Sequence, residues 1–233
     1  MRNYIILNGV NSNTISGLLI STLPSISKPK IRTQTEEIDG RDGDIVTKLG
    51  YSAYDKEIEI GLYGNYDTDE VIEYFNSEGT IVFSNEADKY YNYRILEQID
   101  FKKLIRFKTA KVRLHVQPFK YPLVETTINI SGETTVTNEG NIYARPTLNI
   151  SGSGNVEVIL NGQQIFAIDL GEDATNITID TTKMEAYNPD TTALMNRQVT
   201  GDYSLFKLQA GNNTISLSGT VTSANISNYT RWL

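Results

Sequence analysis

The sequence of 233 residues contains no cysteine, a single histidine and a single tryptophan, and it has no long hydrophobic run. Without cysteine there are no disulfides, thiolate nucleophiles or thiolate metal ligands, so the fold must depend on packing. No stretch approaches the roughly 18 apolar residues of a membrane span, and we predict no membrane insertion. The apolar run Tyr4–Leu7 is too short for a signal peptide, which favours a chain that is made in a cytoplasm and stays soluble.

Positive charge is also scarce, and the formal net charge is -7. Residues 1–120 hold 16 lysines and arginines against 17 acids, whereas residues 121–233 hold only 5 against 11. An acidic chain without a basic stripe lacks the electrostatic footprint of a nucleic-acid-binding protein. We therefore predict no nucleic acid contact.

The first half has the alternation typical of strands. Ile58, Ile60 and Leu62 alternate with Glu57 and Glu59, which predicts a half-buried strand over residues 56–62. Further strands are predicted over 80–83, 90–96 and 111–117.

One short helix is predicted over Asp67–Gly79. Asp67 can cap its start, and Glu70 follows three residues later, which is a capping-box spacing. An apolar face at helical spacing and a closing glycine complete the pattern. The apolar face comprises Val71, Tyr74 and Phe75, and the closing residue is Gly79.

Two prolines, Pro118 and Pro122, follow the last of these strands. Two prolines this close cannot both lie inside a paired central strand. The composition changes after them to short apolar runs separated by Thr, Ser, Asn and Gly, as in a sandwich. We therefore predict two domains, residues 1–120 and 121–233.

The second half is predicted to be a two-sheet antiparallel sandwich. Its sharpest signal is Val156–Ile168, in which two apolar runs meet at Asn161-Gly162. Asn-Gly tolerates the positive φ angles of a type I′ hairpin. Further strands are predicted over 176–180 and 213–218.

Catalytic and metal-binding motifs are missing, so we predict no enzymatic activity, no cofactor and no metal site. The one histidine, His115, lies on the polar side of its predicted strand, which favours a solvated or interface residue over a general base. The acidic run 36–44 lacks the spacing of an EF-hand and is better explained as a turn with a solvated rim.

The stretch Glu37–Asp44, followed by Leu49–Tyr51, resembles the amino-terminal domain of phage distal tail proteins, called Dit. Three later segments of the chain also resemble this family, in the expected order and over nearly the whole length. They are Val116–Tyr121, Asn138–Pro146 with Ile150–Gly152, and Gly201–Ile215.

The resemblance implies a mainly β protein with a split-barrel-like domain that carries one short helix, followed by a galectin-like or jelly-roll sandwich. It implies that residues 1–120 form a homo-hexameric ring, a structural hub between the tail tube and the baseplate of a siphovirus or prophage. The implied partners are the tail tube protein, the tail-associated tip protein and baseplate or receptor-binding proteins. The implied location is the virion tail tip, after assembly in the bacterial host cytoplasm.

Two questions stay open at the level of sequence. Gly40, Arg41, Asp42 and Gly43 either shape a functional loop or form a plain turn. The second question is whether the chain is a carbohydrate-binding module or lectin-like adhesion protein. Such a protein would use exposed aromatic side chains to stack on sugars, whereas the competing explanation is that the aromatics are buried in the sandwich. The aromatics concerned are Tyr187, Tyr203, Tyr229 and Trp232.

Overall fold

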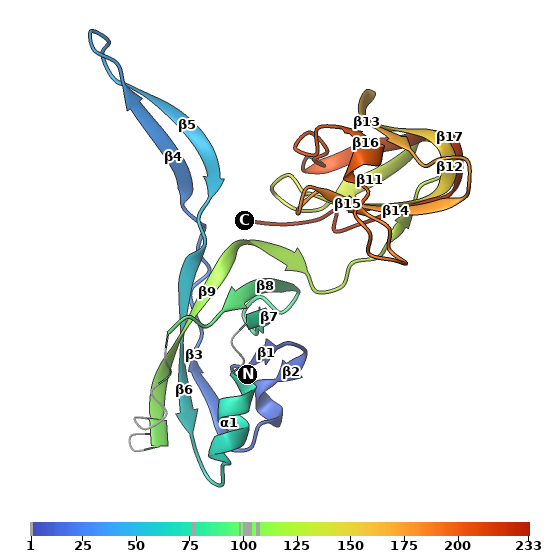
Figure 1. Ribbon diagram of the computed structural model, residues 1–233. Helices are drawn as coiled ribbons and strands as arrows, with labels where there is room; N and C mark the ends of the chain where they lie inside the picture. The colour runs from blue at the N-terminus through green and yellow to red at the C-terminus, as the bar shows by residue number, and fades with distance from the viewer. Residues whose placement is uncertain (1, 76–77, 98, 100–103, 106–107) are drawn as a thin grey trace. The chain divides into compact units, whose positions relative to one another are not determined.

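The computed structural model describes residues 2–75, 78–97, 99, 104–105 and 108–233 (Figure 1). The chain divides into two compact units, one reaching Leu123 and including Leu233, the other spanning Val124–Trp232. Each unit has its own hydrophobic core. Both are built mainly from antiparallel strands.

The first unit is organised around a seven-stranded antiparallel sheet with the order β2-β1-β7-β8-β9-β6-β3. One short α-helix, α1, and a 3-10 turn, η1, accompany the sheet. The bounds are β1 Ile5–Leu7, β2 Val10–Asn11, η1 Ser12–Thr14, β3 Leu18–Thr22, β6 Tyr54–Leu62, α1 Thr68–Tyr74, β7 Glu78–Phe83, β8 Lys89–Arg94 and β9 Thr109–Pro122.

The alternation predicted for residues 56–62 is confirmed in β6. Ile58 and Ile60 are fully buried, and they pair with Val112 and Ala110 of β9. The neighbouring Glu57 lies on the opposite, solvated face, where it forms an ion pair with Lys111. Hydrophobic burial on one face of the sheet therefore organises this unit.

The helix begins as predicted but ends earlier. Asp67 caps α1, accepting a hydrogen bond from the backbone N–H of Asp69 at 2.9 Å. The backbone leaves the helical conformation at Phe75, and Gly79, predicted to close the helix, lies in β7 opposite Tyr93. The predicted end is therefore wrong, because Gly79 pairs with Tyr93 in the sheet. Residues 76–77, part of the predicted helix, lie outside the described residues.

Strand β9 also differs from prediction, because it continues through Pro118 to Pro122. Its pairing with β6 ends at Val116, so both prolines have only β8 as a described neighbour. The register to β8 shifts between Tyr91 and Tyr93, opposite Pro118. A bulge on a half-paired strand is where a proline is tolerated, so the two prolines do not end the strand.

The second unit is an eight-stranded antiparallel sheet that bends over on itself. The long strand β12 pairs with β14 along residues 147–152 and with β13 along residues 155–160, and it pairs with β17 throughout much of its length. Side chains from both parts of the bend share one core. The bounds are β10 Ile128–Asn129, β11 Thr134–Asn138, β12 Thr147–Leu160, β13 Gln163–Asp169, β14 Thr175–Asp180, β15 Glu185–Tyr187, η2 Asn196–Gln198, β16 Val199–Gly201 and β17 Gly211–Ser227.

The hairpin predicted at Asn161-Gly162 is confirmed. Leu160 of β12 pairs with Gln163 of β13, and the two turn residues have φ angles of 51° and 80°. Positive φ at both central positions is the signature of a type I′ turn. This turn fixes the register of the β12–β13 pair.

Candidate assembly surface

The candidate site is a β-hairpin of the first unit that we call the arm (residues 31–51). Its strands β4 (Ile31–Glu37) and β5 (Asp44–Tyr51) pair with each other and form a separate two-stranded sheet. No residue of either strand is buried. In Figure 1 the arm extends away from the strands of its own unit.

An isolated two-stranded hairpin is only marginally stable in water, since it has no hydrophobic face to bury. Its outer edges also present backbone N–H and C=O groups that can pair with another chain. Val46 and Leu49 are 53% and 51% exposed, and Ile38 near the tip is also exposed. The arm therefore has the properties of a surface that is covered in an assembly.

The tip of the arm contains all four residues that the sequence singled out as a loop. Gly40 and Gly43 have φ angles of 80° and 78°, a region that side chains other than glycine avoid. The backbone N–H of Arg41 donates to the carbonyl oxygen of Ile38 at 3.1 Å. The structure brings Gly40, Arg41, Asp42 and Gly43 together at one end of the hairpin, and their functional role stays a prediction.

The tip is strongly acidic. Five carboxylates and one guanidinium lie within residues 36–44. Without these nine residues, the first 120 residues hold 15 basic side chains against 12 acidic ones. The arm tip and the rest of its unit therefore carry charge of opposite sign. The acids of the tip are Glu36, Glu37, Asp39, Asp42 and Asp44.

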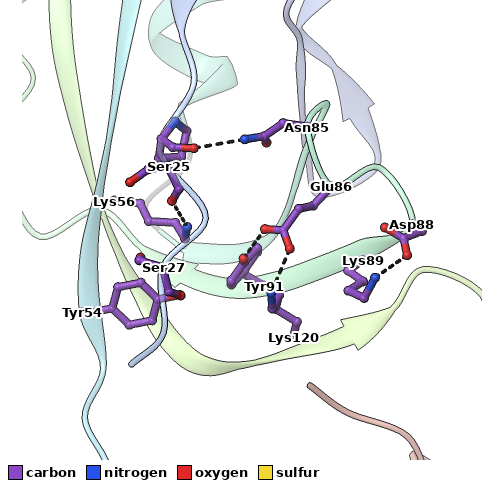
Figure 2. Close-up of polar contacts among 11 residues, drawn as sticks. Ser25, Ser27, Tyr54, Lys56, Asn85, Glu86, Asp88, Lys89, Tyr91 and Lys120 are labelled. Atoms are coloured by element: carbon purple, nitrogen blue, oxygen red, sulfur yellow. Dashed lines mark hydrogen bonds and ion pairs between the residues drawn. The ribbon is translucent and has the colours of Figure 1, made fainter. Parts of the chain in front are cut away.

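The arm is joined to β3 by a connector (residues 23–30) that has no regular secondary structure. Three side chains of the unit donate hydrogen bonds to its backbone carbonyls (Figure 2). They are the Asn85 amide to Pro24 at 3.1 Å, the Lys56 ammonium to Ser25 at 2.9 Å and the Tyr54 hydroxyl to Ser27 at 3.4 Å.

Behind the connector lies a buried polar cluster. Glu86 accepts hydrogen bonds from the Lys120 ammonium at 2.8 Å and from the Tyr91 hydroxyl at 2.5 Å. Burial alone raises the pKa of the Glu86 carboxyl, but these two hydrogen bonds and the nearby lysine charges outweigh it and hold the pKa below its usual value. Burial raises the pKa of Tyr91, and the Glu86 carboxylate raises it further.

His115 lies on the solvated face of the first unit, as predicted. Its Nδ1 is 2.8 Å from a carboxylate oxygen of Asp55, and both side chains are partly exposed. Glu57 and Lys111 form an ion pair on the same face of these two strands. The arrangement is a row of polar and ionic contacts on the surface.

The segment Asn138–Pro146, which resembles the Dit family, contacts the carboxy-terminal part of the second unit. The Asn138 side chain donates to the carbonyl oxygens of Ile142 and Leu208. Gly140 lies so close to the carboxy-terminal segment that a Cβ atom at this position would be 1.8 Å from the carbonyl oxygen of Arg231. The motif therefore anchors the end of the chain.

The aromatics considered for sugar stacking do not form an exposed row. Tyr229 is buried, and Tyr203 packs on Phe166 with ring centroids 5.2 Å apart. Tyr187 and Trp232 are half-buried. Packing within the second unit accounts for Tyr203 and Tyr229. Two of the four aromatics that suggested a lectin are therefore not available for sugar stacking.

In the part of the chain that the structure describes, no group of three His, Asp or Glu side chains is placed to hold a metal ion. Within the same residues, no helix is long and apolar enough to cross a membrane.

Comparison with known proteins gives one kind of match. No family model and no curated protein sequence matches this chain. Among solved structures, the Dit protein (gp 19.1) of phage SPP1, a hub of the adsorption apparatus in phages that infect Gram-positive bacteria, is 17% identical, with a TM-score of 0.64 over 100% of both chains. A chain of the phage P2 baseplate in its activated conformation with Ca is 11% identical, with a TM-score of 0.51 over 100% of this chain and 98% of that one.

The similarity to SPP1 Dit extends over both units and therefore confirms the predicted fold. The chain has a Dit-like fold, mainly β, in which the short helix α1 accompanies the sheet of the first unit. At this level of identity the similarity establishes architecture, and function has to be argued from the surfaces of the molecule.

Proposed function

We propose that this chain is a distal tail protein, a non-enzymatic hub subunit of a phage tail. Residues 1–120 would form the ring and residues 121–233 a sandwich domain attached to it. The ring joins the tail tube to the baseplate or tail tip and takes part in host attachment. The observation that carries the proposal is the arm, an exposed hairpin within a Dit-like fold.

A ring requires a heterologous interface, in which two different surfaces of the subunit meet around a closing rotation. The arm supplies one such surface, because β4 and β5 pair only with each other among the described strands, and the apolar side chains of Val46 and Leu49 are exposed. The second surface belongs to the remainder of the unit on a neighbouring copy. Opposite charge on the acidic tip and on this remainder favours their contact.

The proposed assembly is a homo-hexamer in the virion, built in the host cytoplasm. Its partners are the tail tube protein, the tail-associated tip protein and baseplate or receptor-binding proteins. The Dit-like fold and the exposed arm support this choice of partners, and each can be tested by co-purification. Nucleic acid is not among the proposed partners, since the chain is acidic.

The test is the mass of the purified protein across a concentration series, with negative-stain images of the largest species. Wild-type protein should form closed rings. Val46→Glu should shift assembly to at least about tenfold higher concentration, because a buried, unpaired carboxylate at an interface costs more than about 1.4 kcal/mol.

The matched control is Leu194→Glu, a change at an apolar residue of the second unit that is 69% exposed. It should leave the mass distribution unchanged. Equal assembly of wild type and Val46→Glu, or equal loss in both variants, would contradict the role assigned to the arm.

A further inference from the structure

Lys56 interrupts the hydrophobic pattern of β6. It lies on the same face as Ile58 and Ile60, where the alternation of the strand calls for an apolar residue, and it is only 3% exposed. Its ammonium lies over three aromatic rings, with centroid distances of 5.6 Å to Tyr54, 5.6 Å to Phe83 and 5.0 Å to Tyr91. Figure 2 shows Lys56 with Tyr54 and Tyr91. A buried lysine is rare unless it is paired.

The charge of Lys56 is only partly balanced. Among the described residues, Glu86 is the carboxylate that acts on it, and this carboxylate already accepts a hydrogen bond from Lys120, which is 7% exposed. Burial lowers the pKa of the Lys56 ammonium, an effect that Glu86 opposes and Lys120 reinforces. Two ammonium groups therefore share one carboxylate in this part of the core.

In the described part of the chain, the hydrogen-bond acceptor of the Lys56 ammonium is the carbonyl oxygen of Ser25, at 2.9 Å. Ser25 lies in the connector, whose two prolines, Pro24 and Pro29, are buried and have no N–H to donate. Leu23 packs on the core and the Lys30 carbonyl accepts a hydrogen bond from the backbone N–H of Ser52 at 2.8 Å, one at each end of the connector. Between these ends, side-chain donors hold the connector to its unit in place of a strand ladder. Losing the contact would leave a buried cation without its acceptor.

We propose that Lys56 is a positioning residue for the arm: its buried ammonium, balanced by Glu86, holds the connector and fixes the direction in which the arm leaves the unit. Asn85 and Tyr54 assist at the carbonyls of Pro24 and Ser27. The benefit for assembly rests on the proposed function, because an arm held in one direction loses less entropy when it meets a neighbour. The clamp itself is a property of a single chain.

An apolar residue at position 56 would fill the same space and could stabilise the core, since replacing buried charges by packed apolar groups is often favourable. It could not donate to the Ser25 carbonyl. Lys56 therefore fixes the position of the connector without being needed for the stability of the core. A variant that keeps the side-chain volume but removes the donor separates these two effects.

The test is native-state proteolysis with trypsin, in which mass spectrometry follows cleavage of the Lys30–Ile31 bond at the end of the connector. Lys56→Met keeps the length and apolar body of the side chain but removes the donor. Because one charge-assisted hydrogen bond is lost, we expect cleavage to accelerate about tenfold to a hundredfold. Circular dichroism should show an unchanged strand signal.

The control is Lys111→Met, which removes a lysine from an exposed ion pair on the neighbouring strand. It should change the cleavage rate by less than about twofold, because exposed ion pairs contribute little. Asn85→Ala, which removes the donor to Pro24, provides a second test that leaves the buried charges in place and should give a smaller acceleration. An unchanged cleavage rate in Lys56→Met would overturn the proposal. If Lys56→Met does not fold, an unchanged cleavage rate in Asn85→Ala would overturn it instead.

The experiment is run at a concentration where the protein is monomeric, so that ring contacts do not shield the connector. Wild-type protein that never assembles, combined with accelerated cleavage in Lys56→Met, would reject the hub function and leave the clamp intact. Assembly of the wild type with no effect of Lys56→Met on cleavage would reject the clamp alone.

Discussion

Replacing Gly140 with alanine should release the carboxy-terminal segment of the second unit. A Cβ atom at position 140 would lie 1.8 Å from the carbonyl oxygen and 2.6 Å from the carbonyl carbon of Arg231. Both atoms belong to the backbone, so no side-chain rotation can relieve the clash. The segment around Arg231 must move instead.

The contacts that this movement breaks set the magnitude. Arg231 Nε donates to the carbonyl oxygen of Tyr143 at 2.5 Å, and the backbone N–H of Thr230 donates to the Glu125 carboxylate at 3.1 Å. A hydrogen bond to a charged group is worth about 1.5–3 kcal/mol, so the loss of both predicts about 3 kcal/mol or more. At about 4 °C per kcal/mol for a domain of this size, the melting temperature should fall by roughly 10 °C or more.

The assay uses Trp232, the single tryptophan of the chain, which lies next to Arg231. In Gly140→Ala its fluorescence should shift to longer wavelength before the main unfolding transition. Glu139→Ala, at the exposed neighbouring position, is the control and should melt like the wild type. A melting temperature within about 2 °C of wild type in Gly140→Ala, less than about 1 kcal/mol, would refute the steric argument.

Two other predictions concern acid and turn chemistry. Glu86 has a lowered pKa in the folded chain, so its contribution to stability is present above the unfolded pKa and is lost as pH falls. Burial raises the pKa of Glu125, so its contribution to stability is present at low pH and is lost as pH rises. Glutamine mimics the protonated acid, so the urea midpoints of both Glu86→Gln and Glu125→Gln should converge with that of the wild type on acidification. As pH rises, Glu86→Gln should become less stable than the wild type and Glu125→Gln more stable, and differences from the wild type that do not change with pH would contradict both assignments. Gly162→Ala should cost about 1–2 kcal/mol, because φ is 80° in the hairpin turn, and an unchanged urea midpoint would argue against the type I′ geometry.

Local patterns in the sequence were sufficient for much of the fold. The alternation of Ile58 and Ile60 with acids predicts β6, and Asn161-Gly162 predicts the β12–β13 turn. Both signals depend on neighbours in the sequence. The helix end at Gly79 was missed because pairing with Tyr93, a contact distant in sequence, decides its conformation.

The arm strands could not be predicted in this way. Neither face of β4 or β5 is buried, so no periodic apolar pattern exists to reveal them. The loop at Gly40 and Gly43 was detected only as a turn with a family resemblance. In the sequence, Lys56 is indistinguishable from the polar residues beside it, such as Glu57, and only the structure shows that it faces the core.

The most direct test of the hub assignment is cryo-electron microscopy of a tailed virion that carries this chain, with a tag on the protein to locate it. The expected result is a ring of six copies, each of 26.1 kDa, at the junction between the tail tube and the baseplate, with every arm lying on the neighbouring copy. Density for the chain at any other position, or arms that touch no neighbour, would contradict it.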